Sequence, residues 1–104
     1  MSRAVIVSPH AACVHWLMLN LEQVDEIQFG LDMSWLEAGD CVYGQLAVEQ
    51  IAALNRMAVR YFHVQVPVPF EGLPQTQETL NWLDPQLLEM RVECFEPVCP
   101  HWAV

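Results

Sequence analysis

Two short segments of this 104-residue chain hold the side chains best suited to chemistry. Ser8-Pro9-His10-Ala11 joins a hydroxyl and a histidine that titrates near neutral pH to the backbone amides ahead of a predicted helix. Such amides attract phosphate, because a helix N-terminus carries partial positive charge. Gly44-Gln45-Leu46 offers a glycine beside which a ligand can approach the backbone and an amide side chain that donates or accepts hydrogen bonds.

Each candidate also has a structural interpretation, which stays open at this point. Ser8 can cap the helix with His10 as a solvated loop residue, and Gly44 can lie in an ordinary tight turn. His63 lies in the middle of a predicted strand, so a core histidine hydrogen-bonded to a neighbour is the better interpretation there. Arg60 opens that strand, which places it at the opposite end of the sheet, on the surface or in a subunit contact.

The cysteines and histidines raise the question of a metal site. Cys13-Val14-His15 and Cys99-Pro100-His101 share a Cys-x-His spacing and would supply four ligands to zinc. The chain has no Cys-x-x-Cys, and the two ligands of the first pair fall on different faces of a predicted helix. Nucleophile-elbow, Walker and dinucleotide-binding motifs are missing as well. We therefore predict neither a metal nor a cofactor.

Apolar periodicity predicts the elements that position these segments. The β-branched run Ala4–Val7 predicts a strand buried on both faces, and apolar residues at 14, 17, 18 and 21 predict one stripe of a helix. Asp84-Pro85 resembles an N-cap with proline in the first helical position, which predicts a short helix from Pro85 to Glu89. Further strands are predicted over 24–29, 41–46, 61–66 and 90–94, and a second long helix over 47–58.

Strands that alternate with helices are typical of an α/β fold. We predict a single small Rossmann-like domain over residues 1–104, with a mainly parallel sheet, helices on its faces and an irregular tail at 97–104. Ligands of such sheets bind beyond the carboxyl ends of the strands. The site should therefore be lined by residues 8–12, 29–32, 44–48 and 66–72, which adds Asp32 and Gly72 to the candidates.

The composition excludes several classes of function. Apolar residues make up 54% of the chain, thirteen carboxylates oppose four arginines, and there is no lysine, for a net charge of -9. Disorder is therefore not expected, and neither duplex nucleic acid nor an anionic membrane suits this acidic surface. No stretch of about twenty apolar residues and no signal-peptide core is found, so we expect a cytoplasmic protein with free thiols.

Residues 4–66 resemble a small CRISPR-associated family in an ordered set of motifs. Val7-Ser8-Pro9-His10, followed by Ala11-Ala12 and His15-Trp16-Leu17, is similar to the opening Val-Ser-Arg-His-x-Gly-Ala-x-Glu-Trp of the Csx-sixteen family, an accessory of type III CRISPR systems. The later matches come in the family's order: Val24-Asp25, Leu31-Asp32, Ala38-Gly39-Asp40 with Val42, Gly44-x-Leu-x-Val to Val48, and Arg60-Tyr61-Phe62-His63 for its Ala-Arg-Tyr-x-His strand.

The resemblance implies a compact homodimer that binds cyclic oligoadenylate, the second messenger of type III immunity. It implies a ring nuclease, in which a ribose 2′-OH attacks the adjacent phosphate without a metal and the response is switched off. His10 is then expected as general acid or base, with Ser8 and Gln45 in contact with phosphate or ribose. The rest of the expected ligand-binding set is Pro9, Ala11, Asp32, Gly44, Leu46 and Gly72.

Two cations of the family's pattern are replaced in this chain. Pro9 stands where the family has an arginine, and Glu71-Gly72-Leu73-Pro74-Gln75-Thr76 replaces an Arg-Gly-x-Glu-Leu-Ser stretch. A charged contact to phosphate contributes roughly 1.5–3 kcal/mol. Because the loss of two such contacts can abolish cleavage or binding of this ligand, two other functions remain open. The protein can be a sink that holds the messenger intact, or an acidic module that contacts a basic protein.

Overall fold

The fold is described by a computed structural model over residues 2–66 and 84–93. Gly72 and the rest of the segment 67–83, together with Cys94, Cys99 and the tail at 97–104, lie outside the described residues. The elements are β1 (Ala4–Val7), α1 (Ala11–Asn20), β2 (Glu26–Gln28), β3 (Cys41–Gly44), α2 (Val48–Arg56), β4 (Arg60–Gln65) and β5 (Gln86–Met90).

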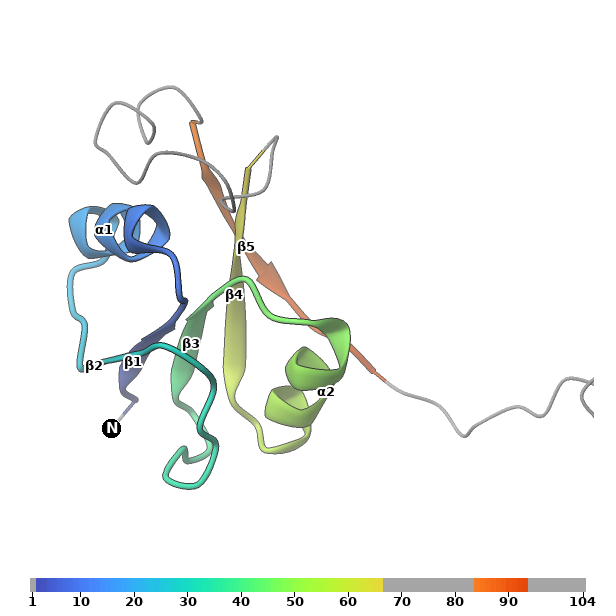
Figure 1. Cartoon of the computed structure of the whole chain (residues 1–104). Coiled ribbons are helices and arrows are strands. Elements are labelled where there is room, and N and C mark those ends of the chain that lie inside the picture. The colour runs from blue at the N-terminus through green and yellow to red at the C-terminus, as the bar shows by residue number, and fades with distance from the viewer. Residues whose placement is uncertain (1, 67–83, 94–104) are drawn as a thin grey trace, which may run out of the picture.

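The five strands form one sheet in the order β2-β1-β3-β4-β5 (Figure 1). β1 pairs in parallel with β2 and with β3, and β3 pairs in parallel with β4. β5 runs antiparallel along β4 at one edge of the sheet. The predicted α/β class with a mainly parallel sheet is confirmed.

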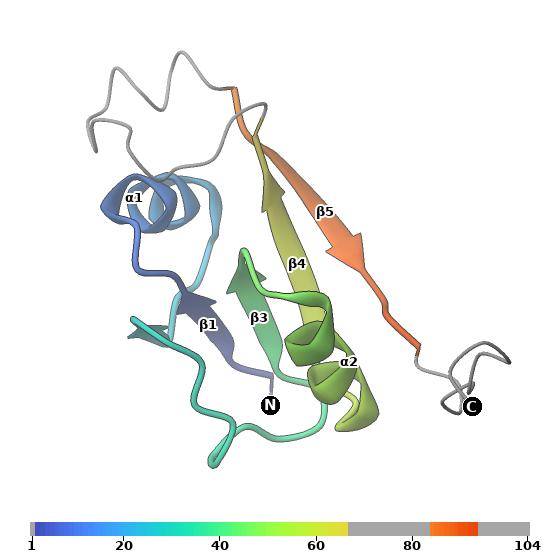
Figure 2. The ribbon, with the colours of Figure 1, turned by 45° about the vertical axis from the view of Figure 1, so that its right-hand side comes forward.

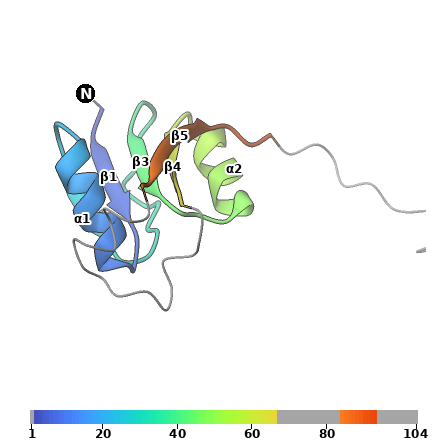
Figure 3. The ribbon, with the colours of Figure 1, turned by 90° about the horizontal axis from the view of Figure 1, so that it is seen from above.

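The two helices cover opposite faces of the sheet (Figure 3). Side chains alternate along each strand, so the central strands β1, β3 and β4 contribute to both apolar layers. On one face the fully buried Ile6 and Val64 pack with Ala12, Cys13 and Leu17 of α1. On the other face α2 contributes Ile51 and Leu54 to a cluster with Val5, Val7, Leu36, Val42, Val59 and Tyr61.

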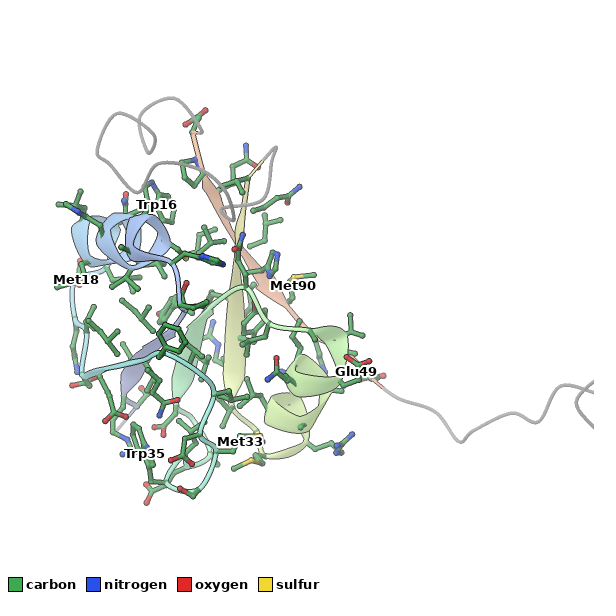
Figure 4. The ribbon with its side chains drawn as sticks, viewed as in Figure 1. Trp16, Met18, Met33, Trp35, Glu49 and Met90 are labelled. Atoms are coloured by element: carbon green, nitrogen blue, oxygen red, sulfur yellow. The ribbon has the colours of Figure 1, made fainter. Side chains whose placement is uncertain are left out.

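The connection between β2 and β3 covers the part of the α2 face that lies over β1. Met33 and Trp35, which Figure 4 labels on this connection, are half-buried against the same cluster as Leu36. Asp40 holds the end of this connection next to β1. Its fully buried carboxylate accepts hydrogen bonds from the backbone amides of Arg3 and Glu37 at 3.1 and 2.9 Å, and from the Arg3 guanidinium at 2.8 Å. Burial alone would raise the pKa of Asp40, but these hydrogen bonds outweigh it and the pKa is lowered.

The short helix predicted from Pro85 to Glu89 is wrong, because these residues form most of β5. Asp84 has φ near +48°, a left-handed conformation that does not start a helix. Pairing with β4 overrides the local N-cap pattern, since it satisfies the backbone groups of that edge over five residues. The last strand therefore ends at Met90, where the sequence predicts that it begins.

The remaining elements occur where they are predicted, although some bounds differ and one residue of the predicted apolar stripe of α1 is exposed. β1 has the predicted bounds, β2 is shorter than the predicted strand over 24–29, and β3, β4 and α2 differ from their predicted ranges by one or two residues at their ends. Met18 was expected in the apolar stripe of α1 but is 53% exposed (Figure 4). No helix within residues 2–66 and 84–93 is long and apolar enough to cross a membrane.

Candidate functional site

The carboxyl ends of β1 and β3 lie side by side at the centre of the sheet. Val7, the last residue of β1, pairs in register with Gly44, the last residue of β3. The chain leaves β1 for α1 on one face and leaves β3 for α2 on the other face (Figure 2). The strand order therefore changes direction between β1 and β3, and such a switch point leaves a crevice where α/β sheets bind ligands. The predicted segments 8–11 and 44–46 follow the two strands on either side of this switch point.

The corner between β1 and α1 is built around a buried serine. Ser8 is only 5% exposed, and its Oγ accepts a hydrogen bond from the backbone amide of His10 at 3.1 Å. The same hydroxyl is hydrogen-bonded to the thiol of Cys13, whose pKa burial raises to about 11. His10 occupies the N-cap position of α1, and its carbonyl accepts the first helical bond from Val14. Ser8 is thus engaged within the corner, whereas the half-buried His10 lies at its surface.

Gly44 is required by the sheet itself. A Cβ atom at this position would lie 2.1 Å from the carbonyl oxygen of Val7, well inside the van der Waals contact distance. The chain that approaches Gly44 closely is therefore the neighbouring strand β1, which accounts for the glycine without a ligand.

Gln45 and Leu46 connect β3 to the start of α2. The Gln45 side-chain amide donates a hydrogen bond to the carbonyl oxygen of Val64 at 2.8 Å, so its donor end is turned toward β4. The backbone amide of Leu46 donates to the hydroxyl of Tyr61 at 2.8 Å. Both residues therefore hold the turn in place against β4.

Tyr61 and His63 form a hydrogen-bonded pair that the sequence did not single out as part of the site. His63 pairs in register with Gly44, so it lies level with the end of β3 although it is in the middle of β4. Its Nδ1 is 2.7 Å from the Tyr61 hydroxyl, and its ring is half-buried. The predicted hydrogen bond to a neighbour is present. The Tyr-x-His spacing, which places both rings on one face of a strand, was the signal available in the sequence.

Asp32 lies on the connection that follows β2. Its Oδ1 accepts hydrogen bonds from the hydroxyl and the backbone amide of Ser34 at 2.7 and 3.0 Å, and these bonds lower the pKa of its carboxyl group. The backbone amide of Asp32 donates to the side chain of Gln28 at 3.0 Å. The exposed carboxylate thus stabilises a local turn in the connection that follows β2.

The chain was compared with family models, with curated proteins and with solved structures. Residues 5–93 match the model of the family described as "Putative CRISPR-associated protein (Cas_VVA1548)". The chain belongs to this family. Neither the comparison with curated proteins nor the comparison with solved structures gave a match.

Membership of the Cas_VVA1548 family confirms the expected CRISPR association over most of the chain. The match extends through β5, beyond the residues 4–66 on which the sequence resemblance was based. The Csx-sixteen identity and the ring-nuclease activity are more specific than this family description, and they stay predictions.

A hollow of about 620 Å³ lies along α1 in this Cas_VVA1548 protein. Residues 8–11 of the β1–α1 corner line one end of it, so this corner is shared with the crevice. The side chains of α1 that line the rest, among the described residues, are Val14, His15, Met18 and Leu19. Met18 and Leu19 are 53% and 62% exposed, which leaves an apolar surface beside the corner.

All four arginines lie toward the other end of the parallel strands, away from the carboxyl ends of β1 and β3. Arg3 precedes β1 and Arg60 opens β4; Arg56 is in the last turn of α2, and Arg91 follows the antiparallel β5. Three of them pair with carboxylates: Arg3 with Asp40, Arg60 with Glu89 and Arg91 with Glu93. The groups that the described residues offer beside the β1–α1 corner are therefore backbone amides and histidines, without an arginine. The described residues hold no cluster of three or more metal-binding side chains.

Proposed function

We propose that this protein binds cyclic oligoadenylate at the crevice between β1 and β3 and cleaves it, which would switch off type III CRISPR signalling. The observation that carries the proposal is the switch point itself, with His10 and the start of α1 on its rim, in a member of a CRISPR-associated family. Open α/β sheets bind nucleotides at this point, because the two diverging chain exits leave room for the ligand.

The β1–α1 corner offers two complementary surfaces to a nucleotide. The first-turn amides of α1 point away from the helix and favour a phosphate, and the first turn contains no acidic residue that would repel it. The apolar wall of Val14, Met18 and Leu19 continues from this corner along α1, where a flat adenine base can pack. From Ala11 to Leu19, eight residues further along, the helix rises about 12 Å, which suits a nucleotide.

His10 is proposed as the residue that transfers a proton during cleavage. A ribose 2′-OH attacks the adjacent phosphate, so the enzyme needs to align the attack, stabilise the charge on phosphorus and move protons. His10 lies at the surface of the corner and belongs to the lining of the hollow. Ser8 supports it through the hydrogen bond to its backbone amide. Gln45 retains its Oε1 as an acceptor for ribose on the other side of the crevice.

A homodimer is part of the proposal, because a cyclic oligoadenylate with an even number of nucleotides has two-fold symmetry. Two copies related by a two-fold axis would present the same corner to both halves of the ring. Sedimentation with and without cyclic tetra-adenylate measures this directly.

The test is incubation with cyclic oligoadenylates of several ring sizes, followed by mass spectrometry. We expect linear products that end in a 2′,3′-cyclic phosphate. His10→Ala should slow their formation at least ~100-fold, the usual minimum contribution of a positioned proton-transfer group. Arg91→Gln, an exposed change at the opposite edge, is the matched control and should cleave normally. Neither binding nor cleavage of any ring size would exclude the proposed ligand.

A sink that holds the messenger intact is the second candidate. The observation that favours it is the position of the four arginines, none of which is at the edge that holds the crevice. Ring opening places extra negative charge on phosphate, and an arginine is the side chain best suited to stabilise it. Stoichiometric capture of cyclic tetra-adenylate, with the intact ring recovered after hours, would select the sink over the enzyme.

A further inference from the structure

The hydroxyl of Tyr61 has three polar partners and only one proton of its own. Tyr61 is fully buried, and its oxygen lies 2.9 Å from the carbonyl oxygen of Gly44, 2.8 Å from the amide nitrogen of Leu46 and 2.7 Å from Nδ1 of His63. The carbonyl can only accept a hydrogen bond, so the hydroxyl proton points to Gly44. The amide can only donate, so it takes one lone pair of the hydroxyl oxygen.

This arrangement fixes the tautomer of His63. The second lone pair of the Tyr61 oxygen faces Nδ1, so that nitrogen must carry a proton for the short contact to be a hydrogen bond. In a neutral ring the other nitrogen, Nε2, then has the lone pair and accepts a proton. Burial lowers the pKa of His63, which keeps the ring neutral at pH 7. Burial also raises the pKa of Tyr61 to about 12, so its hydroxyl remains protonated.

His63 lies level with the carboxyl ends of β1 and β3 and is on the α2 face of the sheet, as Tyr61 is, whereas His10 is the N-cap of α1 on the other face. His63, Gly44 and Val7 form one row across β4, β3 and β1. Two strand spacings separate His63 from Val7, about 10 Å between their Cα atoms, and His10 follows Val7 by three residues. Gly44 lies between them and contributes no side chain to this row.

We propose that His63 is the general base of ring opening and that Tyr61 is its positioning residue. This inference rests on the proposed function. Nε2 of His63 takes the proton of the ribose 2′-OH as the 2′-oxygen forms a bond to phosphorus. The bond from phosphorus to the 5′-oxygen breaks, and that oxygen takes a proton from protonated His10. The products are a 2′,3′-cyclic phosphate and a 5′-hydroxyl. His63 then releases its extra proton to water and His10 takes one up from water, which restores both for the next turnover.

Long-range ¹H–¹⁵N NMR of the full chain tests the tautomer without any ligand. We expect His63 to be protonated on Nδ1 in the wild type. In Tyr61→Phe the acceptor of this proton is lost, so the Nε2-protonated form should gain population. A wild-type ring protonated on Nε2 alone would overturn the inference, whether or not the protein cleaves the messenger.

Kinetics with cyclic tetra-adenylate test the catalytic role. His63→Gln retains a donor for the Tyr61 oxygen but has no basic nitrogen, so we expect kcat to fall at least ~100-fold while Kd changes little. Tyr61→Phe should lower kcat less and leave KM nearly unchanged, and Arg91→Gln is the unaffected control. Cleavage by His63→Gln at the wild-type rate would overturn the inference. If the wild type forms no linear product although His63 is protonated on Nδ1, the proposed cleavage has failed, and the base role fails with it.

Discussion

Removal of the Tyr61 hydroxyl is the perturbation whose effect the structure determines most closely. Tyr61→Phe keeps the buried ring in the α2-side cluster and deletes only the oxygen that joins β3, β4 and the start of α2. The change therefore separates the contribution of these hydrogen bonds from that of apolar packing.

The magnitude follows from the groups that lose a partner. A net hydrogen bond contributes about 0.5–1.5 kcal/mol, and a buried group left without a partner costs about 1–3 kcal/mol. The Leu46 amide and the Gly44 carbonyl both lose the Tyr61 hydroxyl, so we expect the free energy of unfolding to fall by about 2–3 kcal/mol. In a domain of about 100 residues, 1 kcal/mol changes Tm by about 4–8 °C, which gives a decrease in Tm of roughly 10–20 °C.

Thermal and urea unfolding followed by circular dichroism measure this change. Tyr43→Phe is the matched control, because Tyr43 is half-buried and stacks on Phe62 with ring centroids 4.8 Å apart. Among the described residues its side chain is hydrogen-bonded to Cys41 of the same strand and joins no turn to the sheet, so the control should lose much less stability. Equal stabilities of the two variants would refute the assigned role of the Tyr61 hydroxyl.

Three further outcomes follow from the structure. Gly44→Ala should lower the free energy of unfolding by about 3 kcal/mol or more, because its Cβ would lie 2.1 Å from the Val7 carbonyl oxygen; an unchanged urea midpoint would contradict this. Since burial lowers the pKa of His63, its folded form binds fewer protons than the unfolded chain below about pH 6.5. Stability should therefore fall as the pH decreases from about 6.5 toward 5, and the urea midpoint of His63→Gln should depend less on pH in that range. The buried thiol of Cys13, with a pKa raised to about 11, should resist alkylation at pH 8 until the protein unfolds, whereas a peptide map by mass spectrometry should show the half-buried Cys41 reacting before Cys13.

The central strands and both helices were predictable from the sequence because their signals are local. Ala4–Val7 is a continuous apolar run rich in β-branched residues, which is typical of a strand buried on both faces, and it forms β1 with the expected bounds. The apolar spacing and good helix formers of residues 48–56 were likewise sufficient to predict α2. The family relationship was also visible in ordered motifs, and the match over residues 5–93 confirms the CRISPR association.

Tertiary structure decided the composition of the candidate site. Pairing with β4 turned residues 86–90 into a strand, although their local pattern predicted a helix. The inward direction of the Ser8 hydroxyl depends on His10 and Cys13, and that of the Gln45 amide depends on Val64. The Gln45–Val64 bond forms only when segments 19 residues apart pack together, so the residue types alone did not show it.

The sequence by itself determined the edge at which a ligand would bind, since the carboxyl ends of parallel strands lie together whatever their order. Only the fold determined where on that edge the crevice lies, because strand order is set by long-range pairing and not by local propensity. The register of β4 against β3 brought His63 level with Gly44, which a count along a single strand does not show. The hydrogen bonds of Tyr61 then fixed which nitrogen of that ring can accept a proton.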